Sequence, residues 1–166
     1  FTVPCELIPF DQTFRLISME DTRFLHCNIK TLNLIPSVIA YQRCMEQGCQ
    51  ETVFHRGDRV TECAHSNILM IKDGVLCTPP RDNLILPGIT LKHLLMLAEQ
   101  NGIPTKEAPF TMQELAEADE VIVSSSGGLC TQAVELDGKP VGGKAPELLK
   151  KLQDAYAAYY AEDTKA

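Results

Sequence analysis

Short apolar runs and alternating apolar and polar positions predict strands and helices in mixed order along this chain. A loose alternation over 13–19 predicts a strand that ends in the charged group 20–23. Apolar residues at helical spacing predict helices over 36–45, over 89–100 and from 146 onward. Gly48 and Gly102 follow the first two helices, where glycine commonly ends a helix.

Turn dipeptides divide the remaining segments into hairpins. Asp73-Gly74 separates 67–72 from 75–78 and is one of the strongest hairpin signals in a sequence. Gly57-Asp58 and Asp137-Gly138 predict two further hairpins, 51–55 with 59–61 and 133–136 with Val141. Thr111 and Glu114 form a capping box for a short helix to Ala118, and 120–124 is typical of a buried strand.

This order of elements lacks the regular strand and helix alternation of a doubly wound sheet. It favours an α/β fold in which helices pack outside a curled sheet. With 166 residues, 45% of them hydrophobic, the chain is long enough for one good-sized domain or two small ones.

Composition and charge exclude several classes of partner. The net charge of −7 and pI near 5.1 argue against binding to nucleic acid or to an anionic membrane surface. No apolar run is long enough for a membrane span. Seven cysteines without a C-x-x-C pair predict reduced thiols in a cytoplasmic protein, and four scattered histidines indicate no metal site.

The chain begins at Phe1 and carries two prolines within 1–12. We interpret 1–12 as a connector or irregular edge strand, and we expect another segment to precede it.

Lys30 is the candidate catalytic residue because no other charged side chain lies within 26–33. Apolar neighbours, which include Ile29 and Leu32, disfavour an ammonium ion and predict a lowered pKa and a nucleophilic amine. A solvated surface lysine is the alternative interpretation.

Three other segments carry groups that complement such an amine. Glu62 ends a β-branched run and is either a surface carboxylate or the buried partner of a cation such as a pyridinium nitrogen. Gly88-Ile89-Thr90 opens a helix, where free N–H groups either receive an ordinary cap or bind an anion. Ser125 and Ser126 follow a buried strand and are either a solvated turn or additional donors for the same anion.

An amine, a carboxylate and two donor-rich loops are together what pyridoxal 5'-phosphate (PLP) requires. Lysine holds this cofactor as a Schiff base, an acid keeps its ring nitrogen protonated, and N–H and O–H groups bind its phosphate.

Four motifs then resemble those of the class IV (fold type IV) PLP-dependent aminotransferases, and within this family most closely the D-amino-acid enzymes. They are Ile29-Lys30-Thr31-Leu32-Asn33-Leu34, Val60-Thr61-Glu62-Cys63-Ala64-His65-Ser66-Asn67, Ile85-Leu86-Pro87-Gly88-Ile89-Thr90 and Ser124-Ser125-Ser126. The match runs from about Arg15 to Gly138. Leu69 replaces an aromatic residue of the family pattern, and Leu91 a basic one.

The resemblance implies a role for each matching residue. Lys30 would form the Schiff base, Glu62 would face the ring nitrogen, and Leu86 would pack on the ring. Ile89, Thr90 and Ser126 would hold the phosphate, with Ser125 and Ser66 beside the site.

The resemblance also implies a barrel-like C-terminal domain over 13–166 and a homodimer acting on an amino acid and a 2-oxo acid. A smaller N-terminal domain, absent here, would supply an arginine for the phosphate and much of the substrate pocket.

Three alternative functions stay open at this point. Thr31 and Cys63 favour 4-amino-4-deoxychorismate lyase, whereas Leu34-Ile35 and His65-Ser66-Asn67 favour the D-amino-acid enzyme. A branched-chain aminotransferase matches less well around Lys30. A scaffold or oligomerisation domain without catalytic activity is the third alternative.

Overall fold

The computed structural model describes residues 10–163, so most of the connector expected over 1–12 lies outside the described part. The strands are β1 Thr13–Glu20, β2 Glu51–Arg56, β3 Arg59–Cys63, β4 Asn67–Lys72, β5 Val75–Thr78, β6 Thr105–Glu107, β7 Glu120–Ser124, β8 Thr131–Leu136 and β9 Lys139–Pro140. The helices are α1 Ile35–Glu46, α2 Ile89–Gln100, α3 Met112–Ala116 and α4 Pro146–Asp163. None of the described helices is long and apolar enough to cross a membrane.

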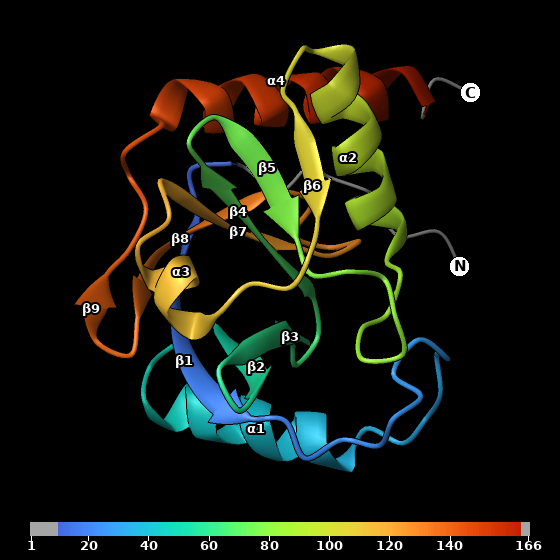
Figure 1. Cartoon of the computed structure of the whole chain (residues 1–166), viewed down its shortest axis with the longest axis vertical. Coiled ribbons are helices and arrows are strands. Elements are labelled where there is room, and N and C mark those ends of the chain that lie inside the picture. The colour runs from blue at the N-terminus through green and yellow to red at the C-terminus, as the bar shows by residue number, and fades with distance from the viewer. Residues whose placement is uncertain (1–9, 164–166) are drawn as a thin grey trace.

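The described strands form one mixed, curled sheet in the order β3-β2-β1-β8-β7-β4-β5-β6, with β9 beside β8 (Figure 1). β1 pairs in parallel with both β2 and β8, and β6 in parallel with β5. The other neighbours are antiparallel. The predicted α/β fold with a curled sheet is therefore confirmed.

Helices cover the sheet at two places. α2 and α4 pack across β4, β5 and β7, whereas α1 lies at the other end against β1 and β2 (Figure 1). Leu69 and Ile71 of β4 join the core under α2 and α4, while Ile68 and Met70 join the core on the opposite face. Successive strand residues point to opposite faces, so burial of both faces explains the continuous apolar run of β4.

The three predicted hairpins are confirmed as antiparallel pairs, and α2 and β7 occupy the predicted ranges. One expectation needs correction, and one strand was missed. The short helix ends at Ala116 rather than Ala118, because the amide of Ala118 closes a tighter turn onto the carbonyl of Leu115 and the amide of Asp119 already bonds to Ile71. The edge strand β6 carried no apolar alternation and was not predicted.

Candidate active site

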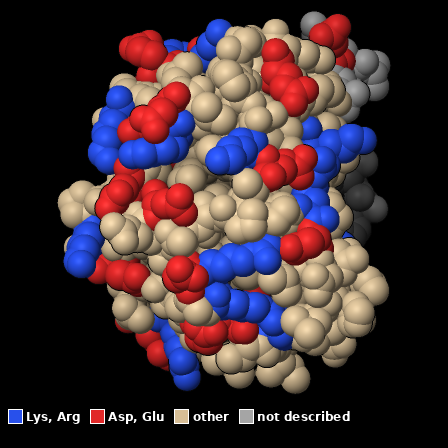
Figure 2. Space-filling model, in the orientation of Figure 1, with Lys and Arg blue, Asp and Glu red and all other residues tan. Residues whose placement is uncertain are grey.

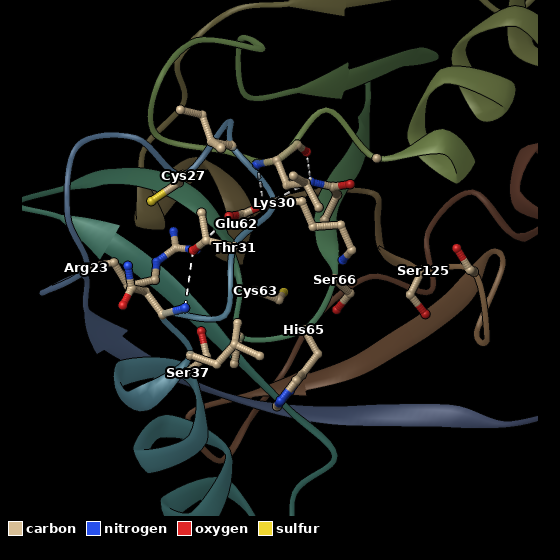
Figure 3. Close-up of a pocket in the computed structure, with 18 of the residues that line it drawn as sticks. Arg23, Cys27, Lys30, Thr31, Ser37, Glu62, Cys63, His65, Ser66 and Ser125 are labelled. Carbon is tan, nitrogen blue, oxygen red and sulfur yellow. Dashed lines mark hydrogen bonds and ion pairs between the residues drawn. The ribbon is translucent and has the colours of Figure 1, made fainter.

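A cavity of about 450 Å³ lies where the loop before α1, the end of β3, the start of α2 and the end of β7 meet. Its lining includes all of the predicted site residues: Lys30, Glu62, Ser66, Leu86, Ile89, Thr90, Ser125 and Ser126. Figure 3 shows Lys30 and Glu62 near the middle of this group, with Arg23 toward one end and Ser125 toward the other. Four segments distant in sequence thus converge on one space.

The loop between β1 and α1 brings Lys30 to the cavity. Ile29, Leu32 and Leu34 line the cavity beside it, but 55%, 94% and 49% of their surfaces are exposed. Lys30 itself is exposed. The expected apolar enclosure of its ammonium group is therefore wrong for the described residues, because these side chains lie on an outward-facing loop.

Glu62 is the buried acid of the cavity, with 5% of its surface exposed at the end of β3. Its Oε2 accepts hydrogen bonds from the amide of Leu86 at 2.9 Å and from Asn67 Nδ2 at 3.1 Å. Its Oε1 accepts one from Arg23 at 2.5 Å. Burial raises the pKa of Glu62 to about 7, although the charge and hydrogen bond of Arg23 act in the opposite direction.

Arg23 and Asp21 belong to the charged group that the sequence indicated only as the end of a strand. Asp21 has 5% of its surface exposed and receives two hydrogen bonds from the Arg23 guanidinium, at 2.9 and 3.0 Å. Burial alone would raise the pKa of Asp21, but the hydrogen bonds and charge of Arg23, with the charge of Arg56, hold it below its usual value. Sequence reasoning missed this pair because adjacent charges usually indicate a solvated turn.

The start of α2 offers main-chain donors to the cavity. Gly88 is its N-cap, and no side chain caps the first turn. Ile89 and Thr90, the first two residues of the helix, line the cavity. The amides of a first helical turn have no partner within the helix and lie at the positive end of its dipole. Of the two interpretations of Gly88-Ile89-Thr90, a side-chain cap is therefore wrong.

The loop after β7 offers hydroxyl groups from the facing side of the cavity. Ser125 Oγ accepts a hydrogen bond from the amide of Gly128 at 2.9 Å, so its own proton stays available for donation. Ser126 is exposed at the cavity, and Ser124 is buried beside it. These positions suit an anion between the loop and α2.

Ser66 has a different environment from the other predicted donors. It lies in the link between β3 and β4, and its Oγ donates to the buried carboxylate of Glu51 at 2.6 Å. The same carboxylate raises the pKa of His65, which also lines the cavity. The Ser66 hydroxyl proton is thus engaged with protein.

Comparison with known proteins identifies one family of similar sequences. The family model "Amino-transferase class IV" matches residues 12–136. A D-alanine aminotransferase of Listeria monocytogenes serotype 4b is 44% identical over 162 residues, covering 97% of this chain and 55% of the relative. That of Staphylococcus haemolyticus is 43% identical over 143 residues, covering 86% and 51%. The chain spans about half the length of these relatives.

Solved structures share the fold. The branched-chain amino acid aminotransferase of Escherichia coli is 28% identical with a TM-score of 0.79, covering 88% of this chain and 52% of that chain. The branched-chain amino acid aminotransferase of Thermoproteus uzoniensis, solved with norvaline, is 24% identical with a TM-score of 0.75, covering 93% and 54%.

Proposed function

Because this chain belongs to the class IV aminotransferases, which are PLP-dependent, we propose that the full-length protein transfers an amino group between an amino acid and a 2-oxo acid and that 13–166 is its PLP-binding domain. The observation that carries this proposal is the convergence of Lys30, Glu62 and the donors of α2 and β7 on one cavity.

The acceptor geometry of Glu62 fits a cationic ring nitrogen. A carboxylate has about four lone-pair positions, and the three hydrogen bonds to Glu62 leave one on Oε1. Because Glu62 lines the cavity, this position is available to a ligand N–H. The amides of Ile89 and Thr90 and the hydroxyls of Ser125 and Ser126 fit a phosphate in the same way.

In the proposed reaction, each residue has a defined task. Lys30 would hold the cofactor through Nζ, and the free amine would carry the α-proton on that same atom. Glu62 would favour a protonated ring nitrogen and Leu86 would form part of the wall beside the ring, while Ser66 holds its part of the site through Glu51. The bound cofactor supplies an electron sink for the negative charge that develops at the α-carbon.

We propose a D-amino acid as the amino donor, which the names of the two relatives described above support. The test is an assay of the full-length protein with D-alanine and 2-oxoglutarate, with L-alanine and L-leucine as competing donors. Transfer from D-alanine supports the proposal, whereas faster transfer from L-leucine would indicate a branched-chain enzyme. Pyruvate release from aminodeoxychorismate without amino transfer would indicate the lyase.

Lys30→Ala tests the central assignment. Unsubstituted protein should gain an absorbance band near the visible edge when PLP is added, and the Lys30→Ala variant should not. Lys139→Ala on β9, exposed and outside the cavity, is the matched control and should keep the band. A Lys30→Ala variant with the band and with turnover would refute the assignment.

This chain spans about half the length of its relatives, and we also propose that the other half forms an N-terminal domain in the full-length protein. We propose further that the full-length chains form a homodimer. Ten of the eleven exposed large hydrophobic residues of the described chain lie within 24–45, including Ile35 and Val38. In Figure 2 the lower right face, where the loop before α1 lies in Figure 1, carries few charged side chains. Apolar surface of this kind commonly marks an interface.

Light scattering of the full-length protein tests the dimer: Ile35→Asp should shift it toward monomer, and a dimer unaffected by that change would refute this face as the contact.

We further propose a cytoplasmic location, which the six free, buried cysteines of the described chain support.

A further inference from the structure

Arg23 lines the cavity and forms four side-chain hydrogen bonds there. Its guanidinium donates to Glu62 Oε1, to both oxygens of Asp21 and, at 3.3 Å, to the carbonyl of Leu84. It also lies over the ring of Phe54, 4.7 Å from the ring centre. Only 10% of the side chain is exposed, so these contacts fix its position.

Asp21 in turn is held from the sheet. Thr61 Oγ1 donates to its Oδ2 at 3.0 Å, and Arg56 Nε donates to the same oxygen at 3.2 Å. The side chain of Asp21 has no exposed surface. Arg56, Asp21, Arg23 and Glu62 therefore form a chain of alternating charges that runs from β2 to the cavity.

The two carboxylates of this chain differ in their number of cationic partners. Asp21 forms ion pairs with both Arg23 and Arg56, whereas Glu62 forms one with Arg23 alone among the described residues. Loss of Arg23 would leave Asp21 with a cation and Glu62 with none. If Arg23 served only to neutralise Asp21, Arg56 could partly replace it. The ion pair with Glu62 has no such replacement among the described residues.

We propose that Arg23 is a positioning residue for the amino transfer: it favours the ionised form of Glu62 and orients the carboxylate, so that Glu62 can stabilise a cationic ring nitrogen. This inference rests on the proposed function. A buried carboxylate without a counter-ion takes up a proton. Protonated Glu62 would lose the negative charge that favours protonation of the ring nitrogen.

The charged and titratable groups around Glu62 come from several elements. Arg23, Asp21, Cys27 and Lys30 lie on the loop after β1, Arg56 on β2 and Cys63 on β3. Burial raises the pKa of the Cys27 and Cys63 thiols, which keeps both neutral near pH 7. Arg23 is thus the cation in direct contact with Glu62.

The first experiment compares Arg23→Gln and Arg23→Lys in the full-length protein. An opposite charge in contact shifts a carboxyl pKa by about 1–3 units, so Arg23→Gln should lower the ionised fraction of Glu62 at pH 7 about fivefold or more. We expect a similar loss in kcat, a small change in substrate KM, and an acidic limb of the pH profile displaced to higher pH. Arg23→Lys, which keeps the charge, should restore part of kcat.

Two controls separate positioning from general destabilisation. Arg59→Gln removes another partly buried ion pair, that with Asp82, outside the cavity, and should leave the pH profile unchanged. In a Glu62→Gln background, Arg23→Gln should cause little further loss of kcat because both changes remove the same interaction. Equal losses in both backgrounds, or an unchanged pH profile in Arg23→Gln, would overturn the proposal.

A readout without activity makes the result independent of the proposed function. In cofactor-free protein, ionisation of Glu62 lowers stability over a pH window whose upper limit is set by the folded form, and this upper limit should move to higher pH in Arg23→Gln, whereas the window should vanish in Glu62→Gln. If Arg23→Gln does not fold, Arg23→Lys is compared with unsubstituted protein. Because Arg23→Lys keeps the positive charge, its pH window should stay close to that of unsubstituted protein. Absence of amino transfer in unsubstituted protein would refute the function, whereas an unmoved window in Arg23→Gln, or a displaced one in Arg23→Lys, would refute the role of Arg23.

Discussion

Gly88→Ala should destabilise the protein through a single side chain, Asn67. A Cβ atom at position 88 would lie 2.3 Å from Asn67 Oδ1, far inside contact distance. The backbone of Gly88 has φ −63° and ψ 144°, which alanine adopts without strain. The cost therefore arises from displacing Asn67 and not from the backbone.

Asn67 cannot move without losing its hydrogen bonds. It is 6% exposed, and its Nδ2 donates to Glu62 Oε2 at 3.1 Å and to the carbonyl of Leu86 at 2.8 Å. A hydrogen bond to a charged group contributes about 1.5–3 kcal/mol, and one to a neutral carbonyl about 0.5–1.5 kcal/mol. We expect Gly88→Ala to lower the free energy of unfolding by roughly 2–4 kcal/mol.

Urea unfolding of the full-length protein, followed by circular dichroism, measures this loss. Gly127→Ala is the matched control, because a Cβ there meets no atom within 4 Å and the backbone has no positive φ. It should change stability by less than about 0.5 kcal/mol. In an Asn67→Ala background the obstructing amide is absent, so Gly88→Ala should cost little. Full additivity of the two substitutions would refute the steric explanation.

Two further predictions concern the buried acid and the core. Burial raises the pKa of Glu62 from 4.5 to about 7, so its folded form binds a proton more tightly than its unfolded form. The resulting stability of cofactor-free protein, about 3 kcal/mol, is fully present below about pH 4.5 and lost as pH rises through about 7. Glu62→Gln should remove this slope from urea titrations at pH 5 and pH 8, and a slope that persists would contradict the assignment. Leu152→Ala should cost about 2–5 kcal/mol because Leu152 is fully buried on the core-facing side of α4, whereas thermal melting of Lys150→Ala, on the exposed face of the same helix, should hardly differ from that of the unsubstituted protein.

Local chemistry made much of the fold predictable. Asp73-Gly74 forms the predicted hairpin with φ of 50° and 78°, the left-handed conformation that these two residues tolerate best. Pro36 lies in the first turn of α1, where its fixed φ and missing N–H suit a helix. Such features depend on a few neighbouring residues, and so they can be inferred from sequence without knowledge of the fold.

Pairings between distant segments could not be predicted in the same way. β1 lies in parallel between β2 and β8, and nothing in its sequence specifies those partners. The side chains that line the cavity could be selected through their chemistry and their resemblance to a family. The buried position of Arg23 could not, because a cation between two carboxylates becomes apparent only when β1, β2 and β3 are placed side by side.

The curl of the sheet explains why a carboxylate at the end of a strand becomes a buried one. β3 is at one end of the strand order and β4 lies near the other end, yet only three residues, 64–66, link them. The sheet must bend back on itself to permit so short a link, and the bend places Glu62 against Asn67 and the Leu86 amide. Glu62 is thus buried by the topology and kept ionisable by Arg23, so the site depends on both the global path of the chain and one local ion pair.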